Sequence, residues 1–169
     1  AYIQISGGVL HINASGDGID SNGDFSVSGG ETYVSGPTND GNGSLDYNGS
    51  AQITGGIFAA SGSSGMAQNF DSSSTLGGIM VNVDEQEGNT EISLLDSSST
   101  ELLSWTAEKQ YSSIIISTPE IQKGETYAIT AGTADQSITM DSLVYGSNAQ
   151  GEMPGNGGER GDMKGGPGN

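Results

Sequence analysis

Two loops with a shared Asp/Asn/Gly pattern contain the residues whose types and spacing could do chemistry. They span residues 16–24 and 42–50 and align with an offset of 26 residues, which matches Asp20 with Asp46. If these loops stack as neighbouring strands do, the two aspartates lie about 4.8 Å apart. Carboxylates that close repel each other unless a cation lies between them. The spacing therefore predicts a cation-binding ladder.

Calcium is the cation that these donors favour. A Ca²⁺ ion accepts roughly six to eight oxygen ligands at about 2.4 Å, so one ion midway could bridge both aspartates. Carboxylate and amide oxygens are hard donors, which suit calcium better than zinc. The alternative is that the same residues are ordinary turn formers whose side chains cap backbone amides. The predicted ligands are Asp17, Asp20, Asn22, Asp24, Asp40, Asn42, Asp46 and Asn48.

The elements that would position these loops form an internal repeat. Gly-Gly pairs recur at 7–8, 29–30 and 55–56, at spacings of 22 and 26 residues, and each pair lies between two stretches of alternating apolar residues. Strand, glycine corner, strand and loop make one coil of a solenoid. The sequence therefore predicts an all-β fold, a right-handed parallel β-helix of about three coils. Period-two alternation turns these residues inward: Ile3, Ile5, Leu10, Ile12, Phe25, Val27, Val34, Ile53, Phe58 and Ala60.

The chain divides into three predicted regions. Residues 1–76 carry the coils. Residues 77–146 contain further strands, predicted at 79–83, 91–95, 101–106, 112–117, 125–131 and 137–144, which either extend the helix irregularly or form a small sheet against it. Residues 147–169 are a Gly/Pro-rich tail without core-forming residues.

Charge and composition limit the partners. The chain has 21 acidic and 4 basic residues, a formal net charge of -17, and no cysteine. Phosphate groups repel such a surface, so we expect no nucleic acid partner and no membrane insertion. The sequence also shows no long apolar run or signal peptide, and we expect any export signal to have been removed.

Three stretches resemble a family of secreted bacterial carbohydrate-binding domain proteins, common in clostridia and similar to polysaccharide lyases without their catalytic groups. They are INASGDGIDSNGD at 12–24, GPTNDGNGSLDYNG at 36–49 and LSWTAEKQYSSIIISTP at 103–119, with GETY at 124–127 and the Gly/Pro/Met tail in addition. The resemblance implies a parallel β-helix, bound calcium, a secreted or cell-surface location, and affinity for polysaccharides such as cellulose or acidic plant-type glycans.

The residues argue against an enzyme. A polysaccharide lyase needs a base to remove the proton next to a uronate, usually Arg or Lys. The basic residues, Lys109, Lys123, Arg160 and Lys164, all lie outside the three coils, where only His11 could serve. Glycoside hydrolysis needs two carboxylates of unlike pKa, and a metal-bridged pair would stay ionised.

Two non-enzymatic functions remain open. The first is polysaccharide binding, in which Tyr33, Tyr47 and Trp105 stack on sugar rings, although core packing is the alternative for Trp105. The second is a structural subunit of an extracellular filament or matrix, in which copies join through the N-terminal strand and the C-terminal tail.

Overall fold

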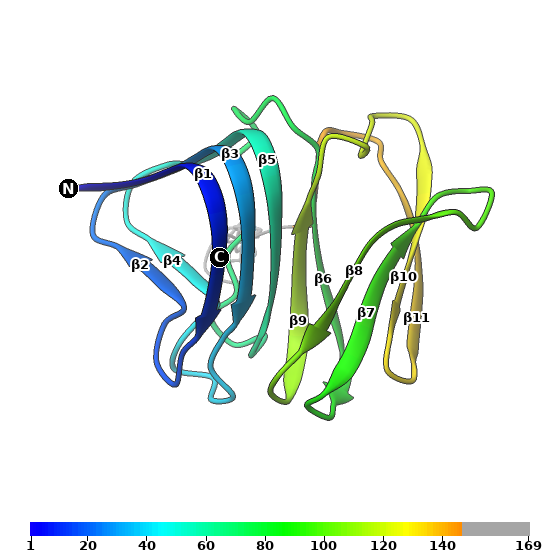
Figure 1. The fold of residues 1–169 in the computed structure, drawn as a ribbon, viewed down its shortest axis with the longest axis horizontal. Helices are drawn as coiled ribbons and strands as arrows, with labels where there is room; N and C mark the ends of the chain where they lie inside the picture. Colours follow the sequence, from blue (N-terminus) through cyan, green and yellow to red (C-terminus); the bar gives the residue numbers. More distant parts are fainter. Residues whose placement is uncertain (147–169) are drawn as a thin grey trace, which may run out of the picture.

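The computed structural model describes residues 1–146, which form twelve β-strands in three sheets (Figure 1). The strands are β1 (Tyr2–Asn13), β2 (Ile19–Ser21), β3 (Asp24–Ser35), β4 (Leu45–Tyr47), β5 (Ala51–Gly62), β6 (Gly78–Gln86), β7 (Thr90–Leu95), β8 (Glu101–Ala107), β9 (Tyr111–Ser117), β10 (Thr126–Ala131), β11 (Ala134–Thr139) and β12 (Val144–Tyr145). The sheet orders are β1-β3-β5-β9-β6-β12, β11-β10-β7-β8 and β2-β4. None of the described residues forms a helix that is long and apolar enough to cross a membrane.

The three repeats stack in parallel as β1, β3 and β5. Ile5 pairs with Val27, and Val27 pairs with Ile53, so the registers match the repeat spacings of 22 and 26 residues. Each strand is irregular at its Gly-Gly pair, where the second glycine has a φ of 82° to 83° that residues with a Cβ rarely adopt. The glycine corners therefore bend all three strands at the same level.

The prediction of a parallel β-helix is wrong, although the chain is all-β. After β5 the central sheet continues with β9, which runs antiparallel to β5 and pairs Ala60 with Ile115. β6 is antiparallel to β9 on its other side. Strands β7, β8, β10 and β11 then form a separate antiparallel sheet. The result is several mixed and antiparallel sheets, not one helical stack.

The stack stops at the third repeat because the residues after β5 do not form another rung. Residues 63–77 contain no strand, and their side chains accept hydrogen bonds from the backbone that a further coil would have paired. Gln68 accepts from the Tyr47 amide at 2.8 Å, and Asp71 accepts from the Ala51 amide at 2.7 Å. These side chains satisfy the buried edge of β4 and of the first half of β5.

The central six-stranded sheet has a hydrophobic core on each face. One core lies against β2, β4 and the 63–77 segment, and it includes the predicted inward residues Phe25, Val27, Val34, Ile53, Phe58 and Ala60, with Ile3, Ile5 and Ile12 packed partly against it. The other core lies against the four-stranded sheet and includes Ile79, Ile92, Leu94, Trp105, Ile114, Ile116 and Ile129. The consecutive isoleucines of β9 serve both cores, because this strand is covered on both faces.

Five of the later strand predictions match observed strands, and the sixth does not. The stretch predicted as one strand at 137–144 is divided between β11, which ends at Thr139, and the short β12. The predicted boundary between residues 76 and 77 falls in the connection between β5 and β6, and the central sheet spans it. The predicted tail at 147–169 lies outside the described residues.

Candidate functional site

A groove lies between the two large sheets. Its floor comes from neighbouring positions on β1 and β3, and its wall comes from β8, the edge strand of the four-stranded sheet. The groove has a volume of about 640 Å³. Its lining residues are Val9, His11, Glu31, Tyr33, Ser104, Trp105, Thr106 and Glu108. The site therefore exists only where the two sheets meet.

Two stacked rings form part of the groove floor. His11 on β1 pairs directly with Tyr33 on β3, and the ring centroids are 5.1 Å apart with an interplanar angle of 14°. The Tyr33 hydroxyl donates a hydrogen bond of 2.8 Å to the Glu31 carboxylate. The pKa of Tyr33 is raised, first by burial and then by this hydrogen bond and the charge of Glu31. The phenol is therefore neutral and held at a fixed position.

Trp105 on β8 lines the groove but lies largely in the core. Its side chain is 9% exposed and belongs to the core between the sheets, while part of it lines the groove. Its indole N–H has no hydrogen-bond partner among the described residues. Core packing, the alternative for this residue, is therefore confirmed, and contact with a sugar ring stays a prediction.

The turn between β8 and β9 is tied to the end of β1. The Asn13 side-chain amide donates to the Glu108 carboxylate, and the Lys109 ammonium donates to the Ala14 carbonyl. The backbone amide of Glu108 also donates to the Ser35 hydroxyl at 3.1 Å. These contacts hold the wall of the groove against its floor.

Tyr47, the third aromatic residue predicted to contact a ligand, lies elsewhere. It is 7% exposed in the core on the opposite face of the central sheet. Its hydroxyl donates to the Asn69 carbonyl at 2.6 Å. Tyr47 is therefore a buried anchor of β4 and offers no ring face to a ligand.

The predicted calcium ligands lie along the β2–β4 side of the molecule. Asp20 on β2 pairs directly with Asp46 on β4, as the offset of 26 predicted. The pKa of Asp46 is raised, first because partial burial disfavours its charge and then because Asp17 and Asp20 carry the same charge. The two loops therefore place like charges near one another without a basic partner among these residues.

Several of these candidates already hold the loops together by hydrogen bonds. The Gly43 amide donates to Asp17 at 2.8 Å, and the Ser50 amide donates to Asp24 at 2.9 Å. Asn48 also donates to Asn22 at 3.4 Å, Asn42 donates to Asn39 at 2.8 Å, and the Ser63 hydroxyl donates to Asp40. Carboxylates that cap amides of the next loop fit the turn-forming alternative.

The described carboxylates among these candidates are too few at any one point to hold a metal ion by themselves. Within residues 1–146, no three or more His, Asp or Glu side chains form a group that could hold a metal ion. A calcium site needs about six oxygens, so most would have to come from backbone carbonyls, amides and water. Calcium binding by these loops stays a prediction.

Asp46→Asn is expected to raise the melting temperature in EDTA at neutral pH, by an amount equivalent to at most about 1 kcal/mol, the range of exposed charge pairs. An acid whose pKa is raised in the folded state costs stability when ionised, and that cost disappears as the pH falls through the folded pKa towards 3.8. The difference between variant and wild type, measured by thermal melts against pH, should therefore shrink at acidic pH.

Asp141→Asn, at an exposed position outside the loops, is the control and should leave the melting temperature unchanged. Calcium bridging predicts a different result, in which added Ca²⁺ stabilises the wild type but not Asp46→Asn. Lower stability of Asp46→Asn in EDTA would contradict the repulsion described above.

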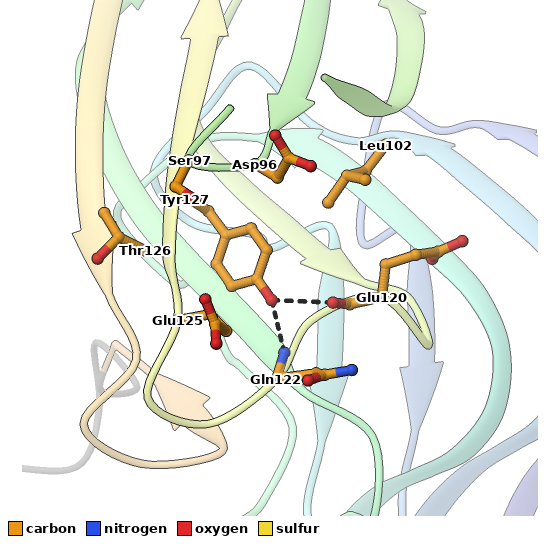
Figure 2. A pocket seen from close by; sticks show the side chains of 8 residues that line it. All are labelled: Asp96, Ser97, Leu102, Glu120, Gln122, Glu125, Thr126 and Tyr127. Carbon is orange, nitrogen blue, oxygen red and sulfur yellow. Dashed lines mark hydrogen bonds between the residues drawn. The ribbon is translucent and has the colours of Figure 1, made fainter. Parts of the chain in front are cut away.

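A second hollow of about 210 Å³ lies near the β7–β8 turn (Figure 2). Its one aromatic ring belongs to Tyr127, whose hydroxyl donates to the Glu120 carbonyl at 2.8 Å and accepts from the Gln122 amide at 2.7 Å. Asp96 accepts from the amides of Ser98 and Thr100 and so caps its own turn. The polar groups here organise turns, which makes this hollow the weaker candidate.

Of the three predicted aromatic contact residues, the structure brings two together in the groove, Tyr33 and Trp105. Sequence reasoning did not include His11, Glu31 or Glu108 in the site. The outward orientation of His11 beside Tyr33 was readable from the alternation of the repeats, whereas nothing in the local sequence placed Glu108 near them. No protein-family model, curated protein or solved structure matches the chain, so the resemblance to carbohydrate-binding domain proteins stays a prediction.

Proposed function

We propose that this chain is a non-catalytic, extracellular polysaccharide-binding protein whose binding site is the groove between β1, β3 and β8. The observation that carries the proposal is the stacked pair of rings of His11 and Tyr33, which lines one hollow together with two carboxylates and the largely buried Trp105 of the other sheet. A ligand held there would contact ring surfaces and fixed hydrogen-bond acceptors at the same time.

Sugars have the surface that this combination suits. A pyranose ring has an apolar face of C–H groups that packs on aromatic rings, and a rim of hydroxyl groups that need hydrogen-bond partners. Glu31 and Glu108 supply carboxylate acceptors, and Ser104 and Thr106 on the wall supply hydroxyl groups. Open grooves with apolar surface and a few polar groups are typical ligand sites.

The charges favour a neutral glycan over an acidic one. The described residues that line the groove include two glutamates and no lysine or arginine, and the whole chain has a net charge of -17. A uronate would meet repulsion unless a cation neutralised it. We therefore place neutral polysaccharides of the cellulose type first, and acidic glycans only in the presence of calcium.

The groove also lacks an arrangement suited to β-elimination. Among the described residues that line it, only His11 has a basic side chain, and its ring is stacked on Tyr33. The nearby Lys109 donates to the Ala14 carbonyl instead of pointing at a substrate position. These contacts support binding without catalysis.

The test is a pull-down with insoluble cellulose and a panel of soluble neutral and acidic polysaccharides, with and without EDTA. Tyr33→Ala is expected to weaken binding about tenfold or more, as loss of a central aromatic contact does. Tyr33→Phe keeps the ring and loses only the hydroxyl, so it should retain most of the affinity. Binding of the neutral glycans should not change in EDTA.

Tyr145→Ala is the matched control, because Tyr145 is a 38% exposed aromatic residue on β12, at the other edge of the central sheet. It should bind as the wild type does. If Tyr33→Ala binds the glycans as tightly as the wild type does, the groove is not the binding site. If the wild type binds none of the glycans, polysaccharide binding is not the function of this chain.

A further inference from the structure

Asn13, Glu108 and Lys109 form a cluster of three different reactive side chains where the end of β1 meets the β8–β9 turn. Asn13 is the last residue of β1, and residues 108 and 109 follow β8. The Asn13 side-chain amide donates to the Glu108 carboxylate, and the Lys109 ammonium donates to the carbonyl of Ala14, the residue after Asn13. An amide, a carboxylate and a primary amine are therefore brought together from segments 95 residues apart.

The backbone holds both sides of this cluster in place. The Ala14 amide donates to the Ser35 carbonyl at 3.0 Å, and the Glu108 amide donates to the Ser35 hydroxyl at 3.1 Å. Ser35, at the end of β3, thus joins the end of β1 to the β8–β9 turn. The flexible stem of Lys109 allows its ammonium nitrogen to move from the Ala14 carbonyl to the side chain of the preceding residue. Groups held this close react far faster than free ones.

The three groups have complementary chemical roles. A neutral lysine amine is a nucleophile, and the carbon of an asparagine side-chain amide can accept its attack. A carboxylate in contact with that amide can carry a proton between the two nitrogens. We propose that Lys109 and Asn13 form an intramolecular amide bond, an isopeptide bond between their side chains, with Glu108 as the proton carrier.

The bond forms by the exchange of one amide for another. The Lys109 ammonium first releases one proton to water, and its Nζ then attacks Cγ of Asn13. The Nζ–Cγ bond forms and the Cγ–Nδ2 bond breaks. Glu108 takes a proton from Nζ and passes it to Nδ2, which leaves as ammonia and takes up the proton released at the start. The exchange needs no oxidant, and the loss of ammonia to the solvent prevents the reverse reaction.

The bond would join the floor of the groove covalently to its wall. It would reinforce the hydrogen bonds that already link β1 to the β8–β9 turn, whatever ligand the groove binds. It would also close a long loop of the chain, and closing a long loop removes much of the conformational freedom of the unfolded state. The bonded chain is therefore more stable than the same chain without the bond.

The intact mass of the full chain tests the proposal. The wild type is expected to be lighter than its sequence by one ammonia molecule. Digestion after glutamate should then release residues 1–31 joined to residues 109–120, because Glu31 is the first glutamate and Glu108 and Glu120 bound the second peptide. An asparagine that had cyclised onto its own backbone would also lose ammonia, but it would leave the two peptides separate.

Two variants remove one reacting group each. Lys109→Arg keeps the positive charge and a donor for the Ala14 carbonyl but has no amine to react. Glu108→Gln keeps the size of the side chain but cannot carry the proton. Both should have the full mass of their sequences. Lys123→Arg is the matched control, because Lys123 is exposed in the turn before β10, and it should lose ammonia as the wild type does. Lys109→Arg should also melt at a lower temperature than Lys123→Arg.

Three results would overturn parts of the proposal. A wild-type chain with the full mass of its sequence has no such bond. If Lys109→Arg loses ammonia and the wild-type peptides stay separate, the reaction lies elsewhere in the chain. If Glu108→Gln forms the bond as completely and as fast as the wild type, Glu108 is not the proton carrier.

Discussion

Phe58→Ala is expected to lower the free energy of unfolding by about 3 to 5 kcal/mol, the range for removing a buried phenylalanine. Phe58 is fully buried on β5, and its ring lies 6.0 Å from that of Phe25 and 5.1 Å from that of Phe70. The truncation would leave a cavity where the third repeat, the 63–77 segment and β9 come together. The rigid strands on either side cannot close it fully.

Chemical denaturation of the full chain measures this effect. Phe58→Leu keeps most of the apolar volume and should lose much less stability. Tyr2→Ala is the control for losing an aromatic side chain, because Tyr2 is 75% exposed, and it should stay within about 0.5 kcal/mol of the wild type. A Phe58→Ala protein as stable as Tyr2→Ala would contradict the packing of this core.

Gly56→Ala is expected to cost roughly 2 to 5 kcal/mol, from two sources of about 1–2 and 1–3 kcal/mol. The first is its φ of 83°, which is unfavourable for any residue with a Cβ. The second is close approach, because a Cβ there would lie 2.6 Å from the Gly30 carbonyl oxygen and 2.7 Å from the Gly29 carbonyl carbon. These are backbone atoms of the neighbouring strand and cannot turn aside.

Gly8→Ala separates the two sources. Gly8 has the same φ of 83°, but a Cβ there would meet no atom within 4 Å. It should therefore show only the conformational cost. Unfolding of both variants should be measured by chemical denaturation. If both lose the same stability, close packing of the corners is not what requires glycine at Gly56.

The register of the N-terminal strands could be predicted because it is encoded locally. A Gly-Gly corner bends the strand, the alternating residues on either side fix which face is apolar, and a one-residue slip would expose that face. The pairing of Ile5 with Val27 and of Val27 with Ile53 follows from counting between corners. The same counting placed Asp20 opposite Asp46.

Strand direction after β5 could not be predicted in this way. The run Ile114–Ile116 indicates a strand covered on both faces, but a covered strand has the same composition in a parallel and an antiparallel sheet. Only the path of the chain through residues 63–77 and back decides it. The β-helix prediction rested on the repeats in residues 1–76 and left open how the later strands join them, whereas β9 continues the same sheet in the antiparallel direction.

In the candidate groove, too, the sequence predicts one part of the site and only the tertiary structure shows the other. The alternation within the repeat already turned Tyr33 and His11 outward, but Trp105 belongs to another sheet. For Tyr47 the available signal was overlooked, because it lies two residues after the buried Leu45 and therefore shares its face. Local alternation assigns a side chain to a face, and it does not say what covers that face.

By itself, the sequence determined the all-β composition, the bends at the glycine corners, the parallel register of β1, β3 and β5, and the acidic surface, because each depends on neighbours within one repeat. Only the tertiary structure decided that β9 ends the parallel stack and that a second sheet places Trp105 and Glu108 beside His11 and Tyr33. Those contacts join segments far apart in the chain, and their free energy comes from burying apolar surface that many different pairings could bury.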